Sequence, residues 1–161
     1  MAFKVFVSYS SHDLEHVEQL QQQLSDSPVE VFVAENSVAP SQELGSTISQ
    51  AIEQCDLFIL VWSKNAQESA WVSQEVGRAG ALKKKILPLV LTEGMQLPGF
   101  IQNLKYLSVH KEPEKALAQA RQIVVGAYEE KVKLESAHAQ AEKDKLALLA
   151  IGALLFWAFS K

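Results

Sequence analysis

Three neighbouring residues near the N-terminus have the side-chain types of a hydrolytic triad. Ser11, His12 and Asp13 are adjacent in the chain, so their side chains point apart, whereas a triad is defined by its geometry in space. His12 and His16 have the i, i+4 spacing of two metal ligands on a helix, but no third ligand is evident. The sequence therefore predicts neither a triad nor a metal site here.

Other familiar signals for chemistry are also missing. Cys55 is the only cysteine, so no intrachain disulfide can form. It falls on an apolar helical stripe, which favours buried packing over a role as nucleophile. The chain has no GxGxxG motif and no GxxxxGKS or GxxxxGKT motif, so neither a Rossmann-type dinucleotide site nor a P-loop is indicated. Any active site must be assembled by the fold from dispersed residues.

Five short segments rich in β-branched and aromatic residues predict strands. They cover residues 3–8, 29–33, 57–62, 86–91 and, with a weaker signal, 105–109. The nearly continuous apolar runs LFILVW at 57–62 and ILPLVL at 86–91 suit strands that are covered on both faces. This is the pattern of a parallel sheet between layers of helices.

The segments between the strands carry apolar residues at helical spacing. Pro113 can occupy the first turn of a last helix, and the turn-rich stretch 92–104 gives the weakest helix signal. The four predicted stripes are Leu14, Val17, Leu20 and Leu24; Leu44, Ile48, Ile52 and Cys55; Val72, Val76, Ala79 and Leu82; and Ala116, Leu117, Ala120, Val124 and Ala127.

Alternation of strands and helices at this length predicts an α/β fold, a five-stranded parallel sheet with helices on both faces and right-handed crossovers. We expect the flavodoxin-like strand order 2-1-3-4-5. In that order the chain changes direction beside the first and third strands, so a ligand should bind where the loops after these two strands separate.

The C-terminal part of the sequence differs from the rest. Residues 129–145 have helix-forming composition but few large apolar residues, which predicts a solvated helical linker. Residues 146–160 are uncharged and apolar, and as a helix they would span roughly 22 Å against a hydrocarbon core of about 30 Å. Flanking lysines and Trp157 fit a tail anchor on the cytoplasmic face of a membrane, and packing against protein is the alternative. The expected organisation is a domain at 1–128, a linker at 129–145 and a hydrophobic tail at 146–161.

Composition limits the class of protein. The chain has 161 residues, 48% of them apolar, which suits one packed domain with a short appendage. The net charge of −4 offers no basic field for a phosphate backbone, so nucleic acid is not expected as a partner. The N-terminal MAFKVFVSYS lacks the features of a signal peptide, and we expect a cytoplasmic location.

Several motifs in order resemble a TIR domain of the bacterial type. They are VFVSYSSHD, the block VEVFVAENSVAPSQELGSTISQAIEQCDLFILVWSKNAQESAWVSQE, and ILPLVL followed by LPGF, and together they span about residues 3–128. Within the block, Trp71 to Glu75 reproduces the Trp-x-x-x-Glu pattern whose glutamate is catalytic in TIR domains that hydrolyse NAD. The resemblance therefore implies that Glu75 is the catalytic residue.

This spacing also makes physical sense. Residues four apart share one face of a helix, so Trp71 and Glu75 can face one site. Loss of nicotinamide leaves positive charge on the ribose, which a fixed carboxylate can stabilise. Because nicotinamide in NAD is already a cationic leaving group, a second acid is unnecessary. The plainer interpretation is that Glu75 is an exposed helix charge and Trp71 a core anchor.

The resemblance also indicates where substrate would be bound. The loop after the first strand would help to line the nucleotide pocket, and the stretch 35–45 resembles the BB loop, which commonly joins neighbouring TIR domains and can complete the active site. Helix capping, by Ser11 or Asp13 at the first helix and by the serines after the third strand, is the structural alternative, as packing is for Trp62. The implied substrate-binding residues are Tyr9, Ser10, Ser11, Glu35, Asn36, Trp62, Ser63, Ser69 and Trp71.

Two positions depart from the family pattern. Ala34 stands where many relatives have an aspartate, and Ser10 stands where some active relatives have an arginine. Either Glu35 replaces the lost acid or the substrate is handled differently.

The resemblance implies an NAD glycohydrolase or cyclase of prokaryotic defence, activated when TIR domains associate. NAD would be its substrate, with no cofactor or metal, and the products would be nicotinamide with ADP-ribose or a cyclic ADP-ribose isomer. The alternative is a noncatalytic adaptor that assembles through the BB loop at a membrane. A reader of a nucleotide signal is less favoured, because no additional sensing domain is present.

Overall fold

A computed structural model describes residues 2–34 and 43–160 of the chain. The chain divides into two compact units, the first ending at Val125 and the second beginning at Gly126. The first unit holds the sheet and the cleft described below. The second consists of the remainder of one long helix, α6 (Pro113–Phe159), whose first residues belong to the first unit.

The first unit is built on a five-stranded parallel sheet. Its strands are β1 (Phe3–Ser8), β2 (Val29–Val33), β3 (Leu57–Trp62), β4 (Ile86–Val90) and β5 (Leu107–Ser108). The order β2-β1-β3-β4-β5 confirms the predicted flavodoxin-like topology. β3 is buried along its whole length, as its apolar sequence requires for a strand with helices on both sides.

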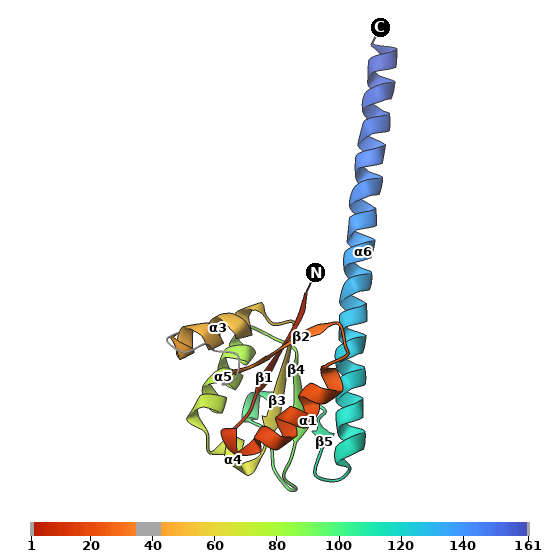
Figure 1. The fold of residues 1–161 in the computed structure, drawn as a ribbon. Helices are drawn as coiled ribbons and strands as arrows, with labels where there is room; N and C mark the ends of the chain where they lie inside the picture. The colour runs from red at the N-terminus through yellow and green to blue at the C-terminus, as the bar shows by residue number, and fades with distance from the viewer. Residues whose placement is uncertain (1, 35–42, 161) are drawn as a thin grey trace. The chain divides into compact units, whose positions relative to one another are not determined.

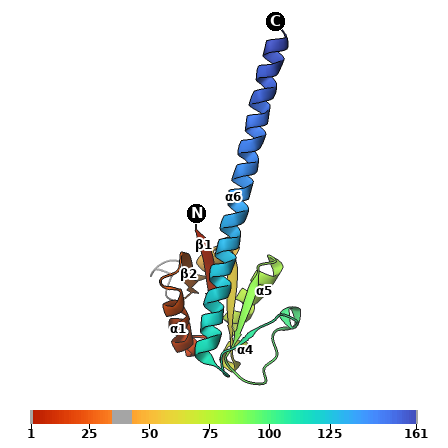
Figure 2. The same cartoon turned by 90° about the vertical axis from the view of Figure 1, so that its right-hand side faces the viewer.

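Helices cover both faces of this sheet (Figure 1). The helices α1 (Leu14–Leu24) and the first turns of α6 lie side by side on one face, as Figure 2 shows. The helices α3 (Leu44–Gln54) and α5 (Ala70–Ala81) cover the other. Among the described residues this unit also holds the short helices η1 (Ser11–Asp13), α4 (Lys64–Gln67) and η2 (Gly99–Ile101).

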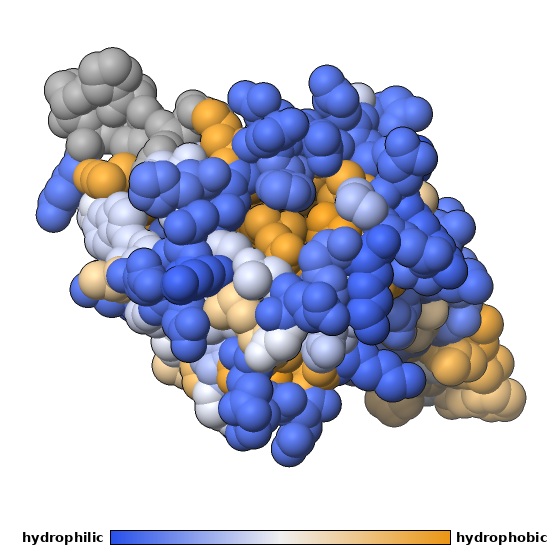
Figure 3. Space-filling model, turned by 90° about the horizontal axis from the view of Figure 1, so that it is seen from below, coloured by the Kyte–Doolittle hydropathy of each residue, from blue (hydrophilic) through white to orange (hydrophobic). Residues whose placement is uncertain are grey.

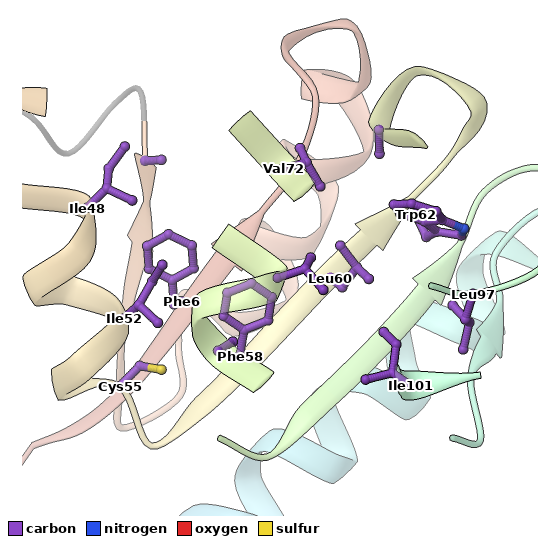
Figure 4. Packing of buried hydrophobic residues seen from close by; sticks show 14 of the residues in the cluster. Phe6, Ile48, Ile52, Cys55, Phe58, Leu60, Trp62, Val72, Leu97 and Ile101 are labelled. Carbon is purple, nitrogen blue, oxygen red and sulfur yellow. The ribbon is translucent and has the colours of Figure 1, made fainter. Parts of the chain in front are cut away.

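The core under α3 and α5 is organised around three aromatic rings. Phe6 of β1 stacks between Phe32 of β2 and Phe58 of β3, with ring centroids 5.4 and 5.3 Å apart. Ile48 and Ile52 of α3 and residues of α5 pack onto these rings (Figure 4). Most of this contact area is apolar, so its burial is the main stabilising contribution to this side of the sheet.

The predicted apolar stripes of α1, α3 and α5 are buried except for one terminal residue of each. Val17, Leu20 and Leu24 of α1 are almost fully buried, whereas Leu14, at its first turn, is 36% exposed. Leu44 at the start of α3 and Leu82 just after α5 are exposed in the same way. Each of these residues lies at or next to a helix end.

The long helix α6 has a continuous helical course through the residues expected to form a linker and a tail. In the second unit the large apolar residues of 146–159 are exposed, among them Leu154, Phe156 and Phe159. No helix within residues 2–34 and 43–160 combines the length and hydrophobicity needed to cross a membrane, and this includes the segment expected to form a tail anchor.

The turn after α5 holds one residue in a conformation that normally favours glycine. Lys83 has a φ of 54°, and the amides of Lys83 and Lys84 donate to the carbonyls of Gly80 and Ala79, both at 3.0 Å. This is the Schellman arrangement that closes a helix, in which the left-handed position is usually glycine.

Replacing Lys83 by glycine should therefore stabilise the protein, because the left-handed conformation costs an L-residue about 1–2 kcal/mol and glycine loses only part of this in chain entropy. We expect the free energy of unfolding to rise by up to about 1 kcal/mol in urea titrations with an unchanged m-value. Lys83→Ala, which removes the charge but keeps Cβ, is the matched control and should stay near the wild type. An equal gain in both variants would trace the effect to charge.

Candidate active site

A cleft lies where the loops after β1 and β3 meet. Its volume is about 380 Å³. Figure 3 views the molecule from the side at which the strands end, and shows a mostly hydrophilic surface with small apolar areas between polar residues. The residues that line the cleft are Tyr9, Ser10, Ser11 and His12 from the first loop and Asn65, Glu68, Ser69 and Trp71 from the second. The structure thus brings together five of the predicted binding residues at the predicted edge of the sheet.

The first wall of the cleft is held by Ser10. Its hydroxyl accepts a hydrogen bond from the amide of His12 (3.4 Å), and its carbonyl accepts one from the amide of Asp13 (2.8 Å). Ser10 is therefore the cap of η1, and the expectation that Ser11 or Asp13 would cap this turn is wrong. Ser11 is exposed, and the Asp13 carboxylate makes no cap bond because it is engaged elsewhere.

The second wall is shaped by two capped helices. Ser63 Oγ accepts from the amide of Ala66 (3.0 Å) at the start of α4, and Ser69 Oγ accepts from the amide of Val72 (3.3 Å) at the start of α5. Each hydroxyl accepts a hydrogen bond from an amide of the first helical turn, which has no acceptor within the helix. Ser69 also lines the cleft, whereas Ser63 does not.

Trp62 lies in the core. It is 4% exposed and its indole Nε1 donates to the carbonyl of Gln96 (3.0 Å). Figure 4 shows its ring within the apolar cluster. Its surroundings are those of a packing residue, which was the structural alternative for this position.

The pair Trp71 and Glu75 is divided between cleft and interior. Trp71 is 39% exposed and lines the cleft. Glu75, one turn further along α5, is only 5% exposed and is not among the residues lining the cleft. The plainer expectation, an exposed glutamate and a buried tryptophan, is therefore reversed. A carboxylate directed into the interior is costly to bury, and buried ionisable groups of this kind concentrate at functional sites.

Two predicted residues, Glu35 and Asn36, lie outside the described residues, together with most of the expected BB loop. Ala34 directly before them is buried. Three cleft residues were not predicted as binding residues: His12, Asn65 and Glu68. The available signal was their position, since all three follow β1 or β3 within a few residues and parallel strands end at one edge.

A second, larger groove carries less chemistry. It has a volume of about 1030 Å³ and lies between the end of α1 and the beginning of α6. Its one arginine, Arg121, donates to the carbonyl of Gln23 and forms an ion pair with Asp26. Its charge is therefore already paired within the protein. Within residues 2–34 and 43–160, no three His, Cys, Asp or Glu side chains are grouped to hold a metal ion.

The family model described as "TIR domain" matches residues 5–124. Among curated proteins no relative matches the chain.

Solved structures share the fold at low sequence identity. The TIR domain of the Toll-related receptor TRR-2 from Hydra magnipapillata is 20% identical, with 74% of this chain and 94% of that chain covered and a TM-score of 0.62. The TIR domains of the activated Roq1 resistosome are 16% identical, with coverage of 78% and 83% and a TM-score of 0.53. The CMP N-glycosidase BcmB of Clostridium botulinum is 24% identical, with coverage of 70% and 95% and a TM-score of 0.51.

Cys55 lies away from the cleft, at the end of α3, and is 3% exposed. Figure 4 shows its sulfur among apolar side chains. Burial raises the pKa of this thiol above its ordinary value, and the nearby Lys84 charge only partly opposes the shift. A neutral buried thiol is a poor nucleophile.

We therefore expect alkylation of Cys55 by iodoacetamide to be at least about 100-fold slower in the folded protein than in urea at pH 8. Because the folded-state pKa is raised, the unfolded state loses its proton first as pH rises, and stability should fall above the ordinary thiol pKa. In Cys55→Ala, the free energy of unfolding from urea titrations at pH 7 and pH 10 should not show this decrease at high pH. Rapid alkylation of the folded protein would contradict the assignment.

Proposed function

The chain belongs to the TIR domain family, and from that premise we propose that it is an NAD-cleaving enzyme with Glu75 as its catalytic residue. The observation that carries the proposal is the placement of Glu75. It is a buried carboxylate one helical turn beyond Trp71, which lines the cleft at the topological switch point. Fully buried glutamates are rare in proteins.

The reaction places few demands on the protein. Cleavage of the bond between ribose and nicotinamide releases neutral nicotinamide and develops positive charge at the sugar, which the Glu75 carboxylate stabilises. Water then completes hydrolysis to ADP-ribose, or a nucleophile within the same molecule closes a cyclic isomer. No proton donor to the leaving group is needed, so one carboxylate suffices.

The groups that line the cleft support binding of a dinucleotide. Trp71 and Tyr9 offer aromatic surface for a planar base, and Ser10, Ser11 and Ser69 offer hydroxyls from both walls. Asn65 and Glu68 add an amide and a carboxylate that can bind sugar hydroxyls. The similarity in fold to an enzyme described as a CMP N-glycosidase is consistent with cleavage of a nucleotide N-glycosidic bond.

Association between copies is the second part of the proposal. The similarity in fold to TIR domains of an activated resistosome supports it. So do the exposed large apolar residues of 146–159 in the second unit, since exposed apolar surface of this extent usually marks an interaction site. We propose that association of TIR domains raises activity, in a role in prokaryotic defence. An adaptor would use the same association without cleaving NAD.

Glu75→Gln should reduce nicotinamide release by about 10²–10³-fold or more, because it removes the charge that stabilises the transition state while keeping the shape of the side chain. Release is measured by chromatography, with folding followed by circular dichroism. Glu18→Gln, which removes a carboxylate from the exposed side of α1, is the matched control and should retain activity. Unchanged release by a folded Glu75→Gln protein would exclude this residue and favour the adaptor.

Activity per molecule should also rise with protein concentration, because association follows mass action. A double variant, Leu148→Glu with Leu155→Glu, places two charges in the apolar segment and should reduce this dependence on concentration. The control variant, Ser136→Glu with Ala139→Glu, adds the same charges to the polar part of the helix and should leave the dependence unchanged. Nicotinamide release and light scattering are measured across the same dilution series. Strict proportionality with no larger species would refute activation by association, and pelleting with lipid vesicles would instead assign the segment to a membrane.

A further inference from the structure

Asp13 joins the two walls of the cleft. It is 7% exposed and lies at the junction of η1 and α1, yet both of its carboxylate oxygens bond to residues about 50 positions away. Oδ2 accepts a hydrogen bond from Ser63 Oγ (2.5 Å), and Oδ1 accepts one from Asn65 Nδ2 (3.3 Å). A single side chain thus connects the loop after β1 to the loop after β3.

The local alternative for this carboxylate is not used. Asp13 occupies the cap position of α1, where an aspartate ordinarily accepts a backbone amide of the first turn, but it makes no such bond. Its partners lie in another segment instead. The bond to Ser63 is buried and short, as is typical of a hydrogen bond to a carboxylate, whereas the bond to Asn65 is longer and only partly buried.

The connection extends to groups that line the cleft on both sides. On the first wall, the Asp13 amide donates to the carbonyl of Ser10. On the second, Ser63 Oγ also accepts from the amide of Ala66 and so fixes the start of α4, while Asn65 itself lines the cleft. A change at Asp13 should therefore alter the distance between the walls and the orientation of the Asn65 amide.

We propose that Asp13 is a positioning residue, which couples the loop after β1 to the loop after β3 and orients Asn65 at the cleft. The consequence for NAD rests on the proposed function: Asp13 sets the affinity for the dinucleotide without touching the reacting atoms. The interaction is made in the same way with substrate and transition state, so its loss should appear in KM more than in kcat.

The test compares Asp13→Asn with Asp56→Asn. The amide side chain that Asp13→Asn introduces can still bond to Ser63, but it has no negative charge and cannot satisfy both donors as the carboxylate does. Asp56 is a matched control, because its Oδ2 accepts from the amide of Lys4 (2.8 Å) at the opposite edge of the sheet, far from the cleft. Both variants should lower the midpoint of thermal unfolding. Amide hydrogen exchange of peptides covering 63–69 and steady-state kinetics with NAD are measured on each.

In Asp13→Asn we expect amide exchange in 63–69 to accelerate about tenfold. KM should also rise about tenfold, while kcat should stay within about threefold of the wild-type value. This is the expected effect of losing one charge-assisted hydrogen bond. Asp56→Asn should change neither quantity. If Asp13→Asn does not fold, Ser63→Ala removes the bond to Asp13 together with the cap of α4. Exchange is then measured in peptides covering 10–16 on the opposite wall, where it should accelerate if Asp13 couples the loops and stay unchanged if only the cap is lost.

The outcomes separate this inference from the proposed function. Unchanged exchange at 63–69 overturns the coupling, and accelerated exchange with unaltered KM overturns its effect on the ligand. If the wild-type protein releases no nicotinamide at any concentration, the proposed function fails, while the exchange measurement still decides whether Asp13 couples the two loops.

Discussion

Pairing of β1 with β3 determines where a ligand can bind in this molecule. The two strands run parallel with Val5 opposite Leu57 and Ser8 opposite Leu60, so both end at the same edge and their following loops leave side by side. Because β2 lies on the far side of β1 and β4 on the far side of β3, the connections diverge here. The cleft is a direct result of this reversal in strand order, and every residue that lines it follows β1 or β3.

The scaffold under the cleft explains how polar residues can be held there. The stacked rings of Phe6, Phe32 and Phe58 and the fully buried β3 anchor the strands from which both loops depart. Close-packed interiors of this kind change shape little. Buried carboxylates such as Asp13 therefore meet fixed partners, and the free energy that their dehydration costs is offset by bonds to Ser63 and Asn65 rather than by movement of the backbone.

The sequence predicted the fold well because the signals that determine it are repetitive. Apolar runs in β3 and β4 and helical stripes in α1, α3 and α5 extend over many residues, and their order leaves few topologies. Short features were less predictable. The last strand is shorter than predicted, Leu107–Ser108 in place of 105–109. The single turn of α4 has no periodicity, so only its position after β3 could have pointed to Asn65. The prediction of the first helix cap was wrong because the Asp13 carboxylate can accept a hydrogen bond either from a local amide or from donors distant in sequence. Only the folded chain brings those distant donors within reach.

Exposure alone does not single out Trp71, since Phe100 and Tyr106 are more exposed and isolated apolar residues are common on protein surfaces. What distinguishes Trp71 is its setting. It borders a polar cleft, the hydroxyl of Ser69 fixes the start of its helix, and the next turn of that helix directs Glu75 into the domain. Helical periodicity links these features, because residues four apart share a face. One turn of α5 therefore separates the tryptophan at the cleft from the one glutamate that the described core encloses.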